Sequence, residues 1–202
     1  MTVQFPEREL EDAANPMDPS DPDAEYSIPV DRFEQEKEAY AHLLDYGICA
    51  KGIVPHCYGW LELSKRHCER IEAILESSDL GNVPLTLLEE PPRAVLIEYF
   101  SDAVRLRHEN ITEALADKAL RGLYEIHSAY VMHGDVHRRN ILVLPDDRVV
   151  WVDFNFSWTP SSRLTCRRQE LLGELYWGWS VFYHHMVRLS TGHALFIFLN
   201  ST

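Results

Sequence analysis

Basic residues are few in this sequence, so it lacks the positive charge that nucleic acids attract. The 202 residues include 19 Lys and Arg against 32 Asp and Glu, which gives a formal net charge of −13. Residues 1–38 hold twelve of the acidic side chains and three of the basic ones. Nonspecific binding to nucleic acid or to an anionic membrane needs a positive field, so we expect neither partner. A bound nucleotide would need local cations or metal ions.

Long apolar runs and a disulfide framework are also missing. No apolar segment reaches the roughly 18 residues that span a bilayer, and the residues after Met1 lack the basic and apolar regions of a signal peptide. The four cysteines, Cys49, Cys57, Cys68 and Cys166, are irregularly spaced, which is typical of reduced thiols in an intracellular protein. We therefore expect a cytoplasmic protein, with the nucleus as an alternative compartment.

The beginning of the chain is predicted to be an acidic leader followed by a helix. Residues 1–28 are rich in Pro, Asp and Glu and have little to bury, so we expect a disordered leader. Apolar residues then recur at helical spacing over Asp31–Leu44. Asp31 is suited to be the N-cap, with Glu34 in the position of a capping box, and Gly47 is suited to end the helix.

The rest of the chain predicts a mixed α+β fold, because strands and helices do not alternate regularly. The segments expected to be strands are Val54–Leu63, Arg93–Phe100, Ile141–Leu144 and Val149–Val152. The segments expected to be long helices are Ile111–Ala129 and Glu170–Leu189. Two short helical pieces are expected between the first two strands. Trp177, Trp179 and Phe182 of the last helix are predicted to be core residues.

Three polar residues near the predicted hairpin could carry phosphoryl-transfer chemistry. Asp135 and Asn140 lie on the loop before the hairpin, and Asp153 follows it, so the two hairpin strands carry Asp153 back beside the loop. Phosphoryl transfer needs a carboxylate near the attacking hydroxyl and metal ions on the phosphates. Carboxylate and amide oxygens are the hard ligands that Mg²⁺ prefers. The spacing therefore predicts a phosphotransferase site.

The same residues resemble the protein-kinase-like superfamily, and most closely its aminoglycoside and choline phosphotransferases and the kinase-like proteins of fungi. His133–Asn140 reads like the H-G-D-x-H-x-x-N loop of that branch, and Val152–Asn155 stands where D-F-G or its variant would. Leu96–Phe100 looks like the hinge strand that joins two lobes, and Phe33–Tyr40 looks like the helix that carries a lysine-pairing glutamate. The resemblance covers about 33–187.

The resemblance implies a kinase-like fold with a partial N-terminal lobe over 29–100 and a shortened, mainly helical C-terminal lobe over 101–202. It implies ATP and Mg²⁺ as cofactors and a hydroxyl group of a small molecule or protein as the acceptor. Asp135 would orient or deprotonate this hydroxyl. Asn140 would assist and, with Asp153, would hold the metal ions. The adenine ring would bind the backbone at the two hinge residues Glu98 and Phe100, and Glu36 would be the glutamate of the N-terminal helix.

Two elements of the family pattern are missing. No glycine precedes Gly47 and the first lysine is Lys37, so this sequence has no Gly-rich loop or lysine strand before the helix of Glu36. After Asp153 there is no Ala-Pro-Glu element, and the later helices of the lobe are reduced. The alternative function is therefore a catalytically impaired kinase-like protein that acts as a binding or scaffold protein. Reduced lobes also leave apolar surface exposed, which predicts self-association.

Overall fold

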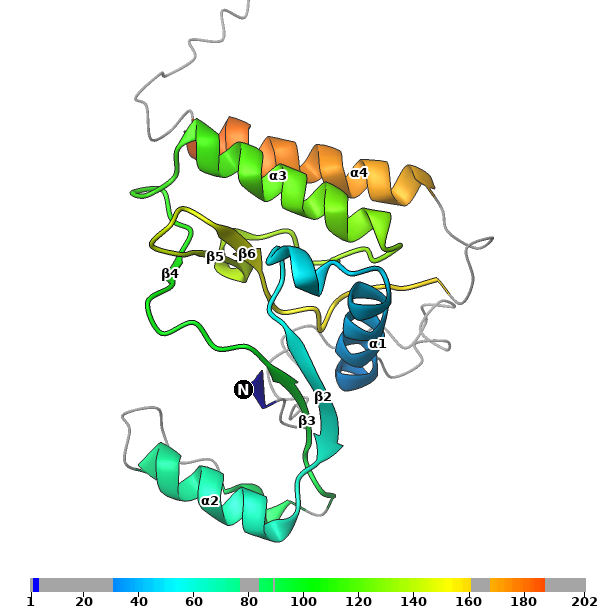
Figure 1. Cartoon of the computed structure of the whole chain (residues 1–202), viewed down its shortest axis with the longest axis vertical. Helices are drawn as coiled ribbons and strands as arrows, with labels where there is room; N and C mark the ends of the chain where they lie inside the picture. Colours follow the sequence, from blue (N-terminus) through cyan, green and yellow to red (C-terminus); the bar gives the residue numbers. More distant parts are fainter. Residues whose placement is uncertain (1, 4–30, 77–83, 89, 161–167, 188–202) are drawn as a thin grey trace, which may run out of the picture.

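The computed structural model describes residues 2–3, 31–76, 84–88, 90–160 and 168–187 (Figure 1). Within these residues the structure is mixed α+β, as predicted, with two small antiparallel sheets. Most of the leader predicted for 1–28 lies outside the described residues, as does the end of the last predicted helix. No helix in the described part of the chain has both the length and the apolar character to cross a membrane.

Helix α1 spans Arg32–Asp45, close to the predicted range. Asp31 is the N-cap, and its Oδ1 accepts a hydrogen bond of 3.1 Å from the backbone N–H of Glu34. The Glu34 carboxylate does not complete the predicted capping box, because it accepts hydrogen bonds from two basic side chains instead. Gly47 ends the helical segment with φ +71°, a left-handed conformation that glycine adopts without strain.

The first sheet has the strand order β1-β3-β2 and packs against α1 (Figure 1). Strands β2 (Cys57–Glu62) and β3 (Arg93–Ile97) pair antiparallel, and both are shorter than predicted. The third strand, β1 (Thr2–Val3), was predicted to belong to the disordered leader. That prediction was wrong for these two residues, because β-favouring Thr and Val pair with the otherwise open edge of β3.

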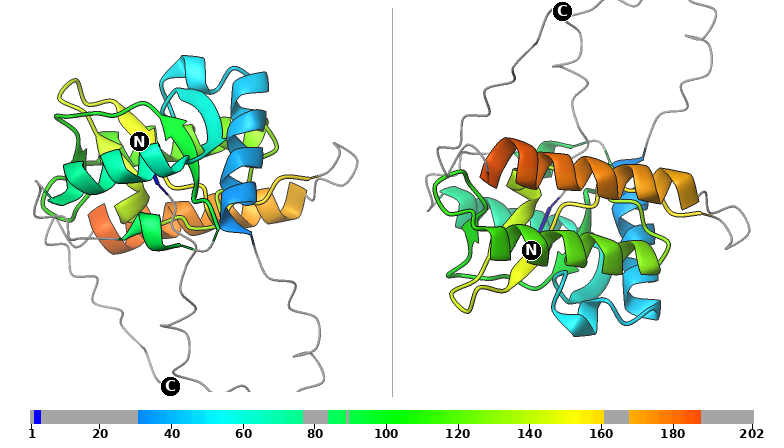
Figure 2. Two further views of the ribbon diagram at one scale, coloured as in Figure 1. Left: turned by 90° about the horizontal axis from the view of Figure 1, so that it is seen from below. Right: turned by 90° about the horizontal axis from the view of Figure 1, so that it is seen from above.

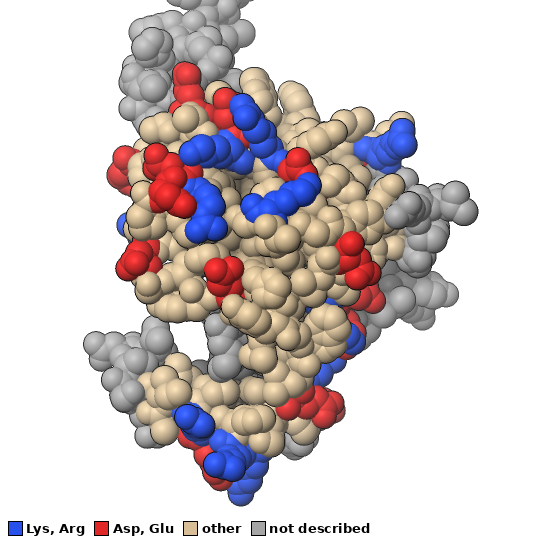
Figure 3. All heavy atoms as spheres, in the orientation of Figure 1, with Lys and Arg blue, Asp and Glu red and all other residues tan. Residues whose placement is uncertain are grey.

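Helix α2 (Lys65–Glu76) and the short 3-10 helix η3 (Leu85–Leu87) join β2 to β3, as the two predicted helical pieces. They share a small hydrophobic core that is separate from the main core. This small core consists of Leu63, Cys68, Leu85 and Ala94. The Glu72 carboxylate ties the two helices by accepting hydrogen bonds from the backbone and hydroxyl of Thr86. Figure 3 shows this part standing away from the main body of the molecule.

The second sheet forms around the predicted hairpin. Strands β5 (Ile141–Val143) and β6 (Val149–Trp151) pair antiparallel, and β4 (Val104–Arg105) adds to β5, which gives the order β4-β5-β6. Helix α3 (Glu113–Ser128) covers this sheet, and the 3-10 helix η4 (Arg138–Asn140) leads directly into β5. The hairpin prediction is confirmed, and it places the segment after β6 beside the loop before β5.

Helix α4 (Arg168–Trp179) continues as a π-helical segment over 180–187 and lies side by side with α3 (Figure 2, right). Gly178 lies on the face turned to α3, where an added Cβ would be 3.1 Å from a methyl group of Leu123. Phe182 is fully buried, as predicted, but Trp177 and Trp179 are 57% and 45% exposed. Their prediction as core residues was wrong, because the close approach at Gly178 leaves them on the outer side of α4.

The main core connects both halves of the chain. Its largest fully buried side chains are Trp151, Tyr40, Phe154, Phe182, Leu43, Leu123 and Ile126. The Trp151 indole N–H donates a 3.0 Å hydrogen bond to the carbonyl of Ala119, so the one polar atom of this ring is satisfied inside the core. Helices α1 and α3, the hairpin and the end of α4 therefore pack as one unit around the candidate site.

Candidate active site

The loop that precedes β5 is held in one conformation by a glycine. Gly134 has φ +79°, and a Cβ built on it would lie 1.9 Å from the carbonyl oxygen of Phe156. No other residue fits there without moving the backbone. This explains why Gly stands between His133 and Asp135, and it presses the loop against the segment that follows β6.

Asp135 and Asn140 lie together on this loop, as the sequence predicts. The Asn140 amide N–H₂ donates to the backbone carbonyl of Asp135 at 2.9 Å and to its Oδ2 at 2.7 Å. The Arg139 guanidinium also donates to Oδ2, at 2.7 Å. Burial raises the pKa of the Asp135 carboxyl, but the hydrogen bonds from Asn140 and Arg139 outweigh burial and hold its pKa below the ordinary value. Asp135 is therefore a carboxylate at neutral pH.

His133 links the loop to the strand of Asp153. Its ring is fully buried, and its Nδ1 accepts a 3.3 Å hydrogen bond from the backbone N–H of Asp135. Its Nε2 therefore carries the proton, and it donates to the carbonyl of Val152 at 3.1 Å. Burial lowers the pKa of His133, which keeps the ring neutral in this role. The histidine of the motif has a structural role here.

Val152 is held from both sides, and this places Asp153. While its carbonyl accepts from His133, its N–H donates a 2.9 Å hydrogen bond to the carbonyl of Asn140. Asp153 follows in a left-handed conformation, with φ +68°, which is uncommon for residues other than glycine. Such backbone outliers gather at functional sites. The structure thus brings Asp153 to the loop of Asp135 and Asn140, as the hairpin predicts.

Glu36 of α1 faces Asp153. Its side chain is only 1% exposed. Burial, and to a smaller extent the negative charge of Asp153, raise the pKa of the Glu36 carboxyl to about 7, although a backbone hydrogen bond from Phe154 opposes the rise. The single lysine of α1, Lys37, donates instead to Glu34 at 2.9 Å. Glu36 therefore lies at the site, next to an acid.

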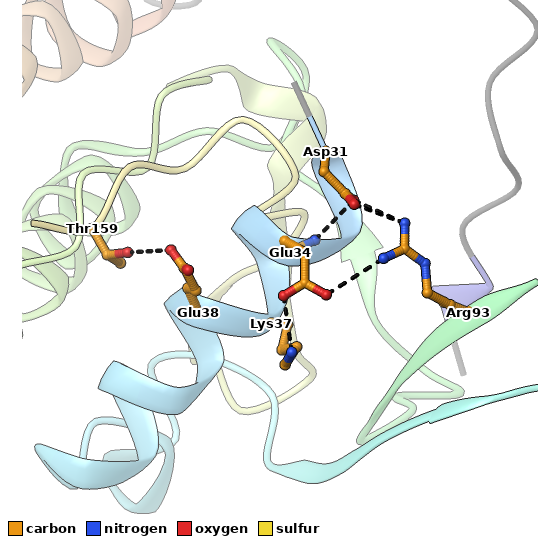
Figure 4. Close-up of polar contacts among 6 residues, drawn as sticks. All are labelled: Asp31, Glu34, Lys37, Glu38, Arg93 and Thr159. Carbon is orange, nitrogen blue, oxygen red and sulfur yellow. Dashed lines mark hydrogen bonds and ion pairs between the residues drawn. The ribbon is translucent and has the colours of Figure 1, made fainter. Parts of the chain in front are cut away.

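Contacts at both sides hold α1, the helix that carries Glu36, and Figure 4 shows these contacts. Arg93 of β3 donates to both carboxylate oxygens of Asp31, at 3.0 and 2.9 Å, and its guanidinium lies 4.5 Å from the centre of the Phe33 ring. On the other side, the Thr159 hydroxyl donates to the Glu38 carboxylate at 3.2 Å. The helix is thus attached both to the first sheet and to the segment after Asp153.

A column of aromatic rings runs beneath the site. Phe154 packs against Tyr40 of α1, with ring centres 5.4 Å apart, and against His133, with ring centres 4.7 Å apart. Trp151 continues the column to Phe182 at 6.0 Å. Because these rings are buried and in contact, the loop, the Asp153 segment and α1 cannot move independently.

Glu174 of α4 is a site residue that the sequence analysis missed. Its Oε2 accepts from the His127 ring at 2.7 Å and from the backbone N–H of His133 at 2.9 Å, and its Oε1 accepts from the N–H of Gly134 at 2.6 Å. Burial raises the pKa of Glu174, but these hydrogen bonds hold it below the ordinary value. In the sequence, Glu174 is an acid within an aromatic helix. No motif fixes its spacing from the loop of His133 and Gly134, so the sequence did not indicate this contact.

The two hinge residues predicted to bind adenine lie apart from the loop in the sequence, just beyond β3. The Glu98 N–H donates to the carbonyl of His56 at 2.8 Å, and the Glu98 carboxylate accepts from the N–H of His56 at 3.2 Å. These bonds extend the pairing of β2 with β3. Phe100 is half-buried and follows Tyr99, which is exposed. The contact of adenine with these two residues stays a prediction.

The residues around Asp153 suit a Mg²⁺ ion that is shared with a phosphate. Asn140 and Asp153 offer hard oxygen donors, and the charge that Asp153 presents to Glu36 is one that a cation would offset. In the part of the chain that the structure describes, no group of three or more His, Cys, Asp or Glu side chains could hold a metal ion alone. Mg²⁺ is commonly held by one or two protein carboxylates together with substrate phosphates, which fits this donor set.

Comparison with known proteins finds no family model that matches this chain, and no curated protein matches it. The likeness to the protein-kinase-like superfamily therefore depends on the motif residues and on their arrangement.

Proposed function

We propose that this chain is an ATP-dependent phosphotransferase of the protein-kinase-like superfamily, which transfers the γ-phosphoryl group to a hydroxyl acceptor. The observation that carries the proposal is the attachment of Val152 to both His133 and Asn140, since it joins the strand of Asp153 to the loop of Asp135. An acid on a loop, an amide and a second acid meet in one place from separate segments, which is the arrangement that phosphoryl transfer uses.

The residues divide the work by their surroundings. Asp135 is ionised and partly accessible, so it can accept the proton of the acceptor hydroxyl or orient that hydroxyl. Asn140 positions the Asp135 carboxylate through two hydrogen bonds and, with Asp153, would hold Mg²⁺. The metal ion, when bound, supplies charge neutralisation on the phosphates. Arg139, on the same carboxylate oxygen, lowers the basicity of Asp135 and adds a cation beside it.

A second candidate function is a binding or scaffold protein on the same architecture with little or no turnover. The observation that favours it is that the buried Glu36 is under the influence of a negative charge, that of Asp153, where the family resemblance implies a lysine. Strand β1, which pairs with β3, carries Thr2 and Val3 and no lysine. Electrostatic stabilisation of the phosphates is a large part of such catalysis, so its loss lowers the rate by orders of magnitude.

Thermal unfolding with Mg²⁺ and ATP tests nucleotide binding, because a ligand that binds only the native state raises the melting temperature. We expect a rise for the native chain that requires Mg²⁺, and a much smaller rise for Asp153→Ala. Asp146→Ala is the matched control, since Asp146 is an exposed acid of the same hairpin that pairs with Arg148 on the surface. No rise for the native chain, or equal rises for both aspartate variants, would contradict the proposal.

Asp135→Asn separates the two functions. If the chain is an enzyme, this variant keeps the rise in melting temperature with Mg²⁺ and ATP but loses transfer of labelled γ-phosphate to an acceptor or to water. A native chain that shows the same rise yet transfers no phosphate at millimolar ATP would instead support the binding function.

A further inference from the structure

We propose that the outer face of α3 and α4 is the interface between two copies of this chain. This surface, called here the α3–α4 face, contains a groove of about 500 Å³ between the two helices. Its apolar lining residues are Leu120, Tyr124, Leu172, Leu175, Tyr176 and Trp179. Figure 2, right, looks onto the two helices from this side.

The apolar side chains of this face are unusually exposed for a monomer. Tyr176 is 71% exposed, Leu172 65%, Tyr124 63% and Trp179 45%. Soluble monomers rarely present contiguous apolar patches of such composition unless the patch binds something. Tyr and Trp are the side chains most enriched among the energetically important residues of protein interfaces.

The rings are already ordered, which favours tight association. Tyr176 stacks on Trp179 with ring centres 6.3 Å apart, and Trp179 stacks on Tyr183 at 6.2 Å. The Tyr183 hydroxyl donates a 2.6 Å hydrogen bond to Asp117 of α3, which fixes the end of the stack. Side chains held in place before binding lose little conformational entropy on binding.

The exposed aromatic and leucine side chains supply more than half of the area that one side of a dimer needs. The four exposed side chains together present roughly 500 Å² of surface per copy, since large side chains of this type have about 150–250 Å² each. A stable interface buries about 800 Å² per partner. The polar residues around the groove can supply the remainder as a rim.

The charges of the face favour a second copy over an unrelated partner. Asp117 and Arg121 both line the groove, one turn apart on α3, with Leu120 between them. Two copies of α3 that cross antiparallel near this leucine bring Asp117 of each copy opposite Arg121 of the other. Such self-complementarity is what a two-fold symmetric interface requires. Arg121 forms no ion pair with the described part of its own chain.

Sedimentation equilibrium of the full chain tests this interface. We expect reversible dimerisation of the native chain below roughly 100 µM, and at least 100-fold weaker association for the double variant Leu172→Asp, Tyr176→Glu. Tyr58→Glu, which changes an exposed aromatic residue on β2, should leave association unchanged. Arg121→Glu should weaken association at least tenfold, and combining Asp117→Lys with Arg121→Glu should restore association. Such restoration would show that Arg121→Glu does not act by misfolding the chain.

Three outcomes would overturn the proposal. The first is a native chain that stays monomeric throughout this range. The second is equal weakening by Tyr58→Glu, which indicates nonspecific association through any aromatic residue. The third is a monomer in which Tyr176 and Trp179 are protected from hydroxyl-radical oxidation, because the face is then covered by the chain itself.

Discussion

Replacing Glu36 with Gln removes a buried negative charge that faces Asp153, and the effect should depend on pH. In the unfolded chain this carboxyl ionises near its ordinary pKa of 4.5, whereas in the native protein burial raises the pKa to about 7. Between these two pH values the native state binds more protons than the unfolded state, so the free energy of unfolding falls as pH rises. Below pH 4.5 both states are protonated and the ionisation of Glu36 has no effect.

The full difference corresponds to about 3 kcal/mol, at about 1.36 kcal/mol for each pKa unit. Because Gln carries no charge at any pH, the free energy of unfolding of the Glu36→Gln variant should not fall in this way as pH rises. Part of the native chain's loss has already occurred at pH 5, so we expect the variant to gain about 2.5 kcal/mol relative to the native chain between pH 5 and pH 8. Urea unfolding at pH 5 and at pH 8 measures this gain, and with a slope of about 2 kcal/mol/M the midpoint should shift by about 1.2 M.

Asp153→Asn provides an internal comparison for this experiment. Burial is the larger cause of the raised pKa of Glu36, and the charge of Asp153 is the second cause. The asparagine variant should therefore keep most of the pH dependence and lose a smaller part. If Glu36→Gln changes the free energy of unfolding equally at pH 5 and pH 8, Glu36 is already ionised in the native state, and the reasoning is wrong.

Three further substitutions, with Gly47→Ala as a control for the first, test how the loop is held. Gly134→Ala should destabilise the protein by at least about 2 kcal/mol in chemical unfolding, because its Cβ would meet backbone; Gly47→Ala, at a similar φ but in open space, should cost about 1 kcal/mol. Glu174→Ala should cost about 3 kcal/mol or more in the same assay, since it leaves the backbone N–H of the buried His133 and the buried His127 ring without an acceptor. Arg139→Ala should raise the pKa of Asp135, which carboxyl NMR measures, and an unchanged pKa would show that Asn140 alone sets it.

The parts of the fold that the sequence predicted well depend on local signals. The N-cap at Asp31 and the end at Gly47 follow from side-chain and backbone preferences within one helical turn. The hairpin follows from two apolar runs around a polar turn, and it is enough to bring Asp153 beside the loop of Asp135. Hydrogen bonding at the hairpin therefore makes this long-range contact predictable from neighbouring residues.

The contacts that the sequence could not predict join segments with no fixed spacing. Glu174 reaches the loop from a helix that comes after it in the chain, and Arg93 reaches Asp31 across the first sheet. The exposure of Trp177 and Trp179 depends on which face of α4 approaches α3. An aromatic helix predicts burial by composition alone, whereas the absence of a side chain at Gly178 lets that face of α4 approach α3 closely.

The supports of the site also explain where a catalytic deficit would fall. The loop of Asp135 is held by His133, Glu174 and the hairpin, all of which lie in the C-terminal half. The Gly-rich loop and lysine that this sequence lacks before α1 would contact nucleotide phosphates rather than this loop. Under the proposed function, their absence would weaken nucleotide binding and the stabilisation of transition-state charge, while the geometry of the proposed base, Asp135, would be retained. A millimolar nucleotide concentration compensates for weak nucleotide binding but not for the lost stabilisation of transition-state charge. Assays at this concentration therefore distinguish an impaired enzyme from a binding protein most clearly.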